Sequence, residues 1–119
     1  MTLKVLVHAS EQRRSRNTGM RADAETVTAA LVMTGISPFF REFGPQPTME
    51  ALLGDNDEAL MGLSRVMQRA ERASRYALGF AAHRADPDAA VIHSAALLHD
   101  FAEMLLWLHA PAQIGRAHV

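Results

Sequence analysis

One apolar stretch of the chain carries the side chains best suited to chemistry. The segment from Asp86 to Pro111 contains His99 and Asp100 side by side, with Glu103 three residues further on. Residues three and four positions apart share a helix face, so Glu103 can approach both. Imidazole and carboxylate groups bind divalent metals, but two or three ligands from one helix leave an ion short of a full coordination set unless another element contributes. His99, Asp100 and Glu103 are therefore candidates for a partial metal site.

A purely structural role is the competing interpretation of the same pair. Burying a carboxylate and an imidazole costs several kcal/mol unless each finds a partner. The preceding helix offers such partners, and we name Arg69, Arg72 and Arg75 as the candidates. His93 lies six residues before His99 and points elsewhere by the helical period, so it is not expected to be a co-ligand.

The segment that positions these residues reads as one long helix. Asp86 can cap it, Pro87 suits its first position, and Pro111 should stop it near His109. Apolar residues cover nearly its whole circumference, which predicts a buried central helix. It is long enough to span a bilayer, but the polar side chains within it argue against a membrane span.

The remaining chain also favours helices. Asp57 to Arg84 shows three- and four-residue apolar steps, to which we assign Met67 and Phe80 among others, and predicts a long amphipathic helix antiparallel to the next one. Before it we expect short helices capped by Asp23, Ser37 and Thr48, with Gly35 ending the first. The pattern of Thr2–Ser10 is compatible with either a strand or a helix, and that of Glu11–Arg21 predicts an exposed loop. The clustered phenylalanines Phe39, Phe40 and Phe43 are expected to pack in the core.

Composition limits the possible functions. The 119 residues suit one small all-α domain, and 12 basic against 13 acidic residues provide no general attraction to nucleic acid. There is no cysteine, which excludes disulfides and thiolate metal sites, and the N-terminus lacks the features of a secretory signal. We therefore expect a cytoplasmic protein. Phosphate or nucleotide binding by the arginines between positions 13 and 21 is a further option, although the segment reads more simply as a solvated loop.

Several segments, in order, resemble the HDOD family, the HD-related output domains of the HD superfamily. The string A-A-L-L-H-D-F-A-E-M-L-L-W, residues 95–107, resembles the helix with the family's His-Asp pair. The segments T-L-K-V-L (2–6), T-A-A-L-V-M-T-G-I (28–36) and R-A-S-R-Y-A-L-G-F-A-A (72–82) resemble parts of the helices that precede it. The resemblance implies an HD-like helical bundle and a regulatory domain of bacterial signalling proteins, whose partners are other signalling domains or proteins.

The resemblance also implies where catalytic residues would lie. Hydrolases of the superfamily bind one or two metal ions through a scattered His and Asp set, and their first histidine would fall about thirty residues before the pair, in the region of Met67 to Ala73, which has none. A lysine is usual where Glu103 stands. We therefore expect a non-catalytic domain that has no cofactor. The alternative is a metal-dependent phosphohydrolase that uses His99 and Asp100.

The resemblance finally bears on the extent of the domain. HDOD domains have further helices before and after the matched segments, so we expect residues 1–113 to be a partial domain, truncated at both ends. Residues 114–119, I-G-R-A-H-V, resemble a translated sequencing adapter and are interpreted as a non-native tail.

Overall fold

The computed structural model describes residues 2–15 and 24–117, and every regular element in these ranges is a helix. This confirms the predicted all-α class. The chain divides into two compact units, one up to Gln46 and one from Pro47 onward, and each is described by itself.

The first unit contains three helices, α1 (Thr2–Ser15), α2 (Val27–Thr34) and α3 (Ile36–Glu42). Of the strand and the helix considered for Thr2–Ser10, the structure has the helix, α1. It extends to Ser15, so the loop predicted from Glu11 was wrong over 11–15. The arginines predicted to lie in that loop have side chains outside the described residues.

The helix ends of the first unit differ in part from the prediction. Thr26 caps α2 by accepting a hydrogen bond from the Ala29 N–H, whereas Asp23 lies outside the described residues. Gly35 ends α2 as predicted, with a positive φ of 87° that suits glycine. The same Gly35 is the N-cap of α3, so the cap predicted at Ser37 was wrong.

The core of the first unit is small. α1 packs against α2, and α2 against α3. The buried apolar side chains are Val5, Leu6, Ala9, Ala24 and Ala30. Phe43 packs edge-on against the His8 ring, but Phe40 is 66% exposed, which makes its predicted core position wrong.

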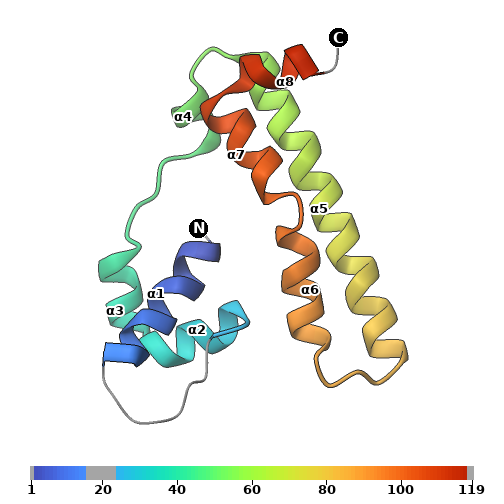
Figure 1. Cartoon of the computed structure of the whole chain (residues 1–119). Helices are drawn as coiled ribbons and strands as arrows, with labels where there is room; N and C mark the ends of the chain where they lie inside the picture. The colour runs from blue at the N-terminus through green and yellow to red at the C-terminus, as the bar shows by residue number, and fades with distance from the viewer. Residues whose placement is uncertain (1, 16–23, 118–119) are drawn as a thin grey trace. The chain divides into compact units, whose positions relative to one another are not determined.

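The second unit is organised along its longest helix (Figure 1). A short helix, α4 (Met49–Leu53), is capped by Thr48 as predicted and precedes α5 (Asp57–His83), the expected long helix. The Asn56 side chain caps α5 by accepting a bond from the Ala59 N–H at 3.0 Å. The chain then returns antiparallel along α5 as α6 (Ala89–Leu98) and α7 (Phe101–His109) and ends with α8 (Pro111–Ala117).

One stripe of α5 forms most of the core of this unit. Its buried residues recur at three-, four- and seven-residue steps, as expected for one helix face: Ala59, Leu63, Val66, Ala70, Ser74 and Ala81. Met67 and Phe80 were assigned to the apolar face, but they are 43% and 70% exposed. Ile114 of α8 is also buried, at 5% exposure, which does not test the interpretation of residues 114–119 as non-native.

The α7 helix packs tightly against α5 at Gly62. A Cβ at this position would lie 2.4 Å from the nearest ring atoms of Trp107. Real Cβ contacts are never so short, so the hydrogen of glycine is what allows the indole ring to lie against the backbone of α5. The two helices are held together here by a contact that few other residues would permit.

The single buried helix predicted from Asp86 to Pro111 was wrong in two respects. The helix is interrupted at His99 and Asp100, where His99 keeps helical dihedrals but Asp100 does not, and this divides it into α6 and α7; the helix also starts at Ala89 rather than at Asp86 or Pro87. In addition, no described side chain of α6 or α7 is fully buried. Apolar composition alone could not show whether this chain has elements to cover both sides of the segment.

The same stretch meets a simple test for a membrane span. Ala89–His109 is long and apolar enough to cross a bilayer, and none of it is buried inside the structure. Length and composition are weak evidence, because the core helix of a soluble protein passes the same test. The sequence-based argument against a span stays a prediction.

Candidate functional site

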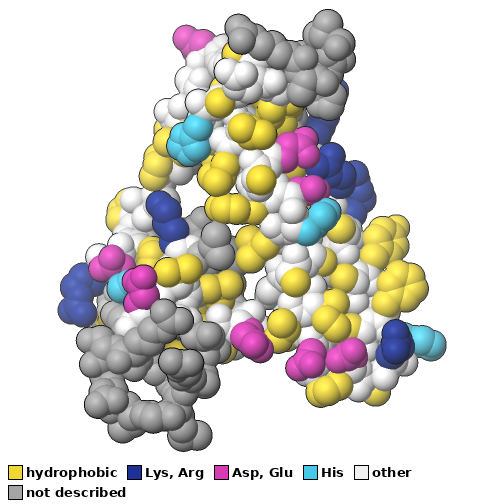
Figure 2. All heavy atoms as spheres, viewed as in Figure 1, with side chains coloured by type: hydrophobic (Ala, Val, Ile, Leu, Met, Phe, Trp, Pro, Cys, Tyr) yellow, Lys and Arg dark blue, Asp and Glu magenta, His cyan; other side chains and the backbone are white. Residues whose placement is uncertain are grey.

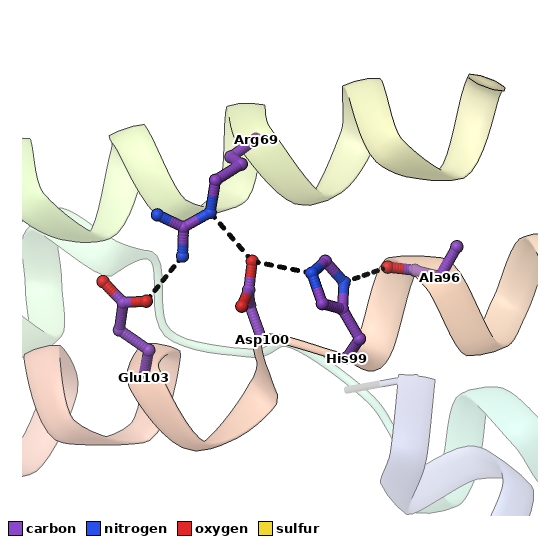
Figure 3. Close-up of polar contacts among 5 residues, drawn as sticks. All are labelled: Arg69, Ala96, His99, Asp100 and Glu103. Atoms are coloured by element: carbon purple, nitrogen blue, oxygen red, sulfur yellow. Dashed lines mark hydrogen bonds and ion pairs between the residues drawn. The ribbon is translucent and has the colours of Figure 1, made fainter. Parts of the chain in front are cut away.

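The His99-Asp100 pair faces the middle of α5, where one arginine bridges two carboxylates (Figure 3). Arg69 Nε lies 2.9 Å from Asp100 Oδ2, and Arg69 Nη2 lies 2.5 Å from Glu103 Oε2. The guanidinium is a planar group with several N–H donors in fixed directions, and it can therefore serve two acceptors at once. Arg69 thereby ties α5 to the start of α7.

The break between α6 and α7 places Asp100 for this contact. Asp100 is the N-cap of α7, with φ −93° and ψ 17°, and its side chain makes no capping bond to its own helix. A short polar side chain that bonds elsewhere competes with regular helix geometry. The Asp100 carboxylate is directed to Arg69 instead, while its backbone carbonyl accepts the N–H of Met104.

The imidazole of His99 lies between two acceptors. Its Nδ1 is 2.6 Å from the carbonyl oxygen of Ala96, and its Nε2 is 3.2 Å from Asp100 Oδ2. A neutral imidazole has a single N–H and can donate to only one of them, whereas the protonated ring can donate to both. Both ring nitrogens therefore already face protein oxygens, which a metal would have to replace.

The site is partly open to solvent. The side chains of Arg69 and His99 are 50% and 51% exposed, that of Glu103 is 36% exposed, and that of Asp100 is 19% exposed. The predicted burial of the His-Asp pair was thus wrong for His99. Exposure of this degree screens the charges and limits what the pairs contribute to stability.

Arg69 controls the ionisation of its partner. Its hydrogen bond lowers the pKa of the Asp100 carboxyl below the ordinary value; partial burial opposes this shift, and the charges of Arg69 and His99 add to it. The pKa of Arg69 itself is raised, chiefly by the hydrogen bonds to Asp100 and then by that to Glu103. Both directions mean that the charged forms stabilise each other.

The donor set does not fit a bound metal as it is placed. Within the described ranges, no group of three or more histidine or acidic side chains could together hold an ion. The two carboxylates that could contribute already bind the guanidinium. The assignment of His99, Asp100 and Glu103 as metal ligands stays a prediction.

The structural interpretation of the His99-Asp100 pair named three arginines as possible partners, and the structure distinguishes them. Arg69 contacts Asp100 as that interpretation predicts. Arg75 instead pairs with Glu71, one turn earlier on the same helix, and Arg72 makes no hydrogen bond or ion pair with a described residue. The partner of the His99 ring that the sequence missed is the Ala96 carbonyl, three residues earlier, a backbone group whose role no side-chain pattern reveals.

Comparisons with known proteins identify no relative of this all-helical chain. No family model, curated protein or solved structure matches the chain.

Proposed function

We propose that the chain is a regulatory HDOD-type domain of bacterial signal transduction, which acts through protein contacts and not through catalysis. The observation that supports this proposal is the position and bonding of Arg69. In the superfamily's hydrolases the first metal-binding histidine would fall about thirty residues before the pair, and Arg69 stands 31 residues before Asp100.

The charge of Arg69 is the reason why an arginine at this position supports a non-catalytic role. A guanidinium supplies, from the protein itself, positive charge to carboxylates that could otherwise bind a divalent cation. It cannot lose its proton at ordinary pH and cannot activate a water molecule as a metal does. An ion pair at this place stabilises the contact between α5 and α7, so the pair would serve the fold. A cytoplasmic location and signalling proteins as partners belong to the same proposal.

Metal-dependent phosphohydrolysis is the second candidate. It is favoured by the exposure of the His99 side chain and by the 3.2 Å between its Nε2 and Asp100 Oδ2, which keeps two possible ligand groups together at the surface. This function would need Arg69 to swing away and further ligands to be supplied.

A turnover assay on the full chain separates the two candidates. Purified protein is analysed for bound Mn, Fe and Zn, and hydrolysis of bis(p-nitrophenyl) phosphate is followed with each metal added. His99→Ala is the test variant, and His93→Ala on the same segment is the matched control. We expect no metal-dependent hydrolysis above the buffer rate. Turnover that His99→Ala abolishes and His93→Ala retains would establish the phosphohydrolase instead.

A further inference from the structure

One side of α5 presents exposed aromatic and basic side chains. Tyr76 and Phe80 are 69% and 70% exposed, and Arg65 and Arg72 are exposed on the same side of the helix. Steps of seven, four and four residues relate these positions, so they form a continuous ridge about 22 Å long. Figure 2 shows basic side chains over the middle of α5 and hydrophobic ones projecting from its C-terminal half. We call Arg65, Arg72, Tyr76, Phe80 and the adjoining Gly79 the α5 ridge.

The ridge has positive charge that the described part of the chain does not neutralise. Residues 65–84 include five arginines and a single acidic residue, in a chain whose net charge is −1. Arg69 and Arg75 are paired with carboxylates. Arg65 and Arg72 make no hydrogen bond or ion pair within the part of the chain that the structure describes. Local positive charge without a counter-ion favours an acidic partner.

Gly79 adds a recess to this surface. It lies within the 27-residue helix, three residues after Tyr76, and a Cβ built on it would meet nothing within 4 Å. A glycine at an exposed helical position lowers helix stability relative to alanine, and here no packing requires it. Its absence of a side chain does allow another backbone to approach α5 closely beside the two aromatic rings.

We propose that the α5 ridge is the docking surface for an acidic, amphipathic helix of a partner protein. The partner helix lies along the ridge with small or apolar residues against Gly79, Tyr76 and Phe80, and with carboxylates toward Arg65 and Arg72. Helices pack at about 8–10 Å when side chains of one fill grooves of the other, and a glycine permits the short end of that range. This rests on the proposed function, because it supplies the contact surface that a non-catalytic domain needs.

The composition of the ridge favours protein over other anionic partners. Tyrosine and arginine are the residues that most often dominate binding energy at protein interfaces. Nucleic acid is bound through many phosphate contacts, whereas the ridge has two unpaired arginines and the whole chain is slightly acidic. A membrane-surface helix binds through a wide apolar face, whereas the ridge has only two aromatic rings, which follow two arginines.

Selection from a displayed peptide library tests the proposal. A library of helical peptides of about sixteen residues, enough to cover the ridge, is selected on the full chain. We expect the selected peptides to be enriched in Asp and Glu over the starting library. Their affinity, measured by fluorescence anisotropy, should fall about ten-fold or more for Arg72→Glu, Tyr76→Ala and Gly79→Gln.

Matched substitutions in the other unit serve as controls. Arg41→Glu makes the same charge change as Arg72→Glu, and Phe40→Ala removes an aromatic ring exposed to a similar degree as Tyr76. Both should leave the affinity unchanged. Gly79→Gln replaces glycine by a better helix former in open space, so a loss of binding by this variant cannot be attributed to unfolding.

Several results would overturn the proposal. These are failure to select any peptide, no acidic enrichment, or affinities insensitive to the three ridge variants. Labelled oligothymidylate or vesicles containing phosphatidylglycerol that bind more tightly than the peptides, with the same sensitivity to the variants, would replace protein by another partner. The outcome is separate from that of the turnover assay, since His99-dependent hydrolysis would reject the proposed function whatever the peptides do.

Discussion

The two halves of α5 contain one glycine each within regular helix, but the space around the two glycines differs. Gly62 lies under the indole ring of Trp107, where a Cβ would collide, and Gly79 faces open space. The same contrast holds for the arginines, because Arg69 is engaged by two carboxylates while Arg72 has no described partner. One face of α5 is thus covered by its own chain at Gly62, and another face, which includes Gly79 and Arg72, presents groups that a partner could contact.

The comparison shows that residue type alone does not tell a structural glycine from an available one. What distinguishes them is the helix face on which each lies: Gly62 faces Trp107 of α7, whereas a Cβ at Gly79 would meet nothing within 4 Å, although α6 also packs along α5. The contrast can be measured, since substitutions in the two halves should have opposite effects on stability.

The largest effect is expected for Gly62→Ala. The added methyl group must displace the Trp107 ring, and overpacking of this kind costs about 1–3 kcal/mol, from which the better helix propensity of alanine recovers up to about 1 kcal/mol. Urea unfolding followed by the fluorescence of Trp107, the only tryptophan, measures the loss directly. An unchanged or raised midpoint would show that the Gly62 contact is not tight.

Gly79→Ala should have the opposite sign. The position is open, so alanine adds about 0.5–1 kcal/mol of helix stability without a clash. The same urea titration should show a higher midpoint than that of the wild-type chain. A lower midpoint would mean that another group packs against Gly79, which would remove the recess from the ridge.

A smaller gain is expected at the end of α5. Ala85 has a φ of 53°, a left-handed conformation that favours glycine, and the N–H groups of Ala85 and Asp86 close the helix by bonding to Ala82 and Ala81. Ala85→Gly should therefore stabilise by about 0.5 kcal/mol after the entropy cost in the unfolded chain. Ala82→Gly, at an exposed helical position nearby, is the control and should destabilise instead. Equal effects of the two substitutions would contradict the described helix end.

The smallest effect is expected for Arg69→Met, and it should depend on pH. Because Arg69 lowers the pKa of Asp100 in the folded state, this pair adds stability above the unfolded pKa of about 3.9 and loses it as the pH falls through the lower folded value. The variant should be less stable than the wild type near neutral pH, and the difference should shrink below about pH 4. Urea midpoints compared across this range, at low and high salt, provide the measurement. A difference that is constant with pH would assign the role of Arg69 to packing.

Part of this structure follows from local patterns. The periodic apolar steps specify α5, and the hydroxyl of Thr48 specifies the start of α4, because both signals act within a few residues. A contact of Asp100 with an arginine of the antiparallel neighbour also follows, although the sequence left Arg69, Arg72 and Arg75 open, and the structure selects Arg69.

The features that the sequence did not reveal depend on tertiary context. The composition of residues 91–108 predicted burial, but burial depends on which elements cover the segment. The helix break at Asp100 accompanies a carboxylate that bonds to another helix, and no local pattern in the sequence indicates it. Phe80 was assigned to the apolar face of α5 because it joins the three- and four-residue apolar steps, although it is 70% exposed. Among the groups on which the docking proposal rests, Phe80 is therefore one for which sequence expectation and structure disagree.

The most direct test of the account is the affinity of Gly79→Gln for a selected acidic peptide, measured together with its urea midpoint. The account predicts binding weaker by about ten-fold or more, with a midpoint no lower than that of the wild type. Unchanged affinity would show that the α5 ridge is not the contact surface.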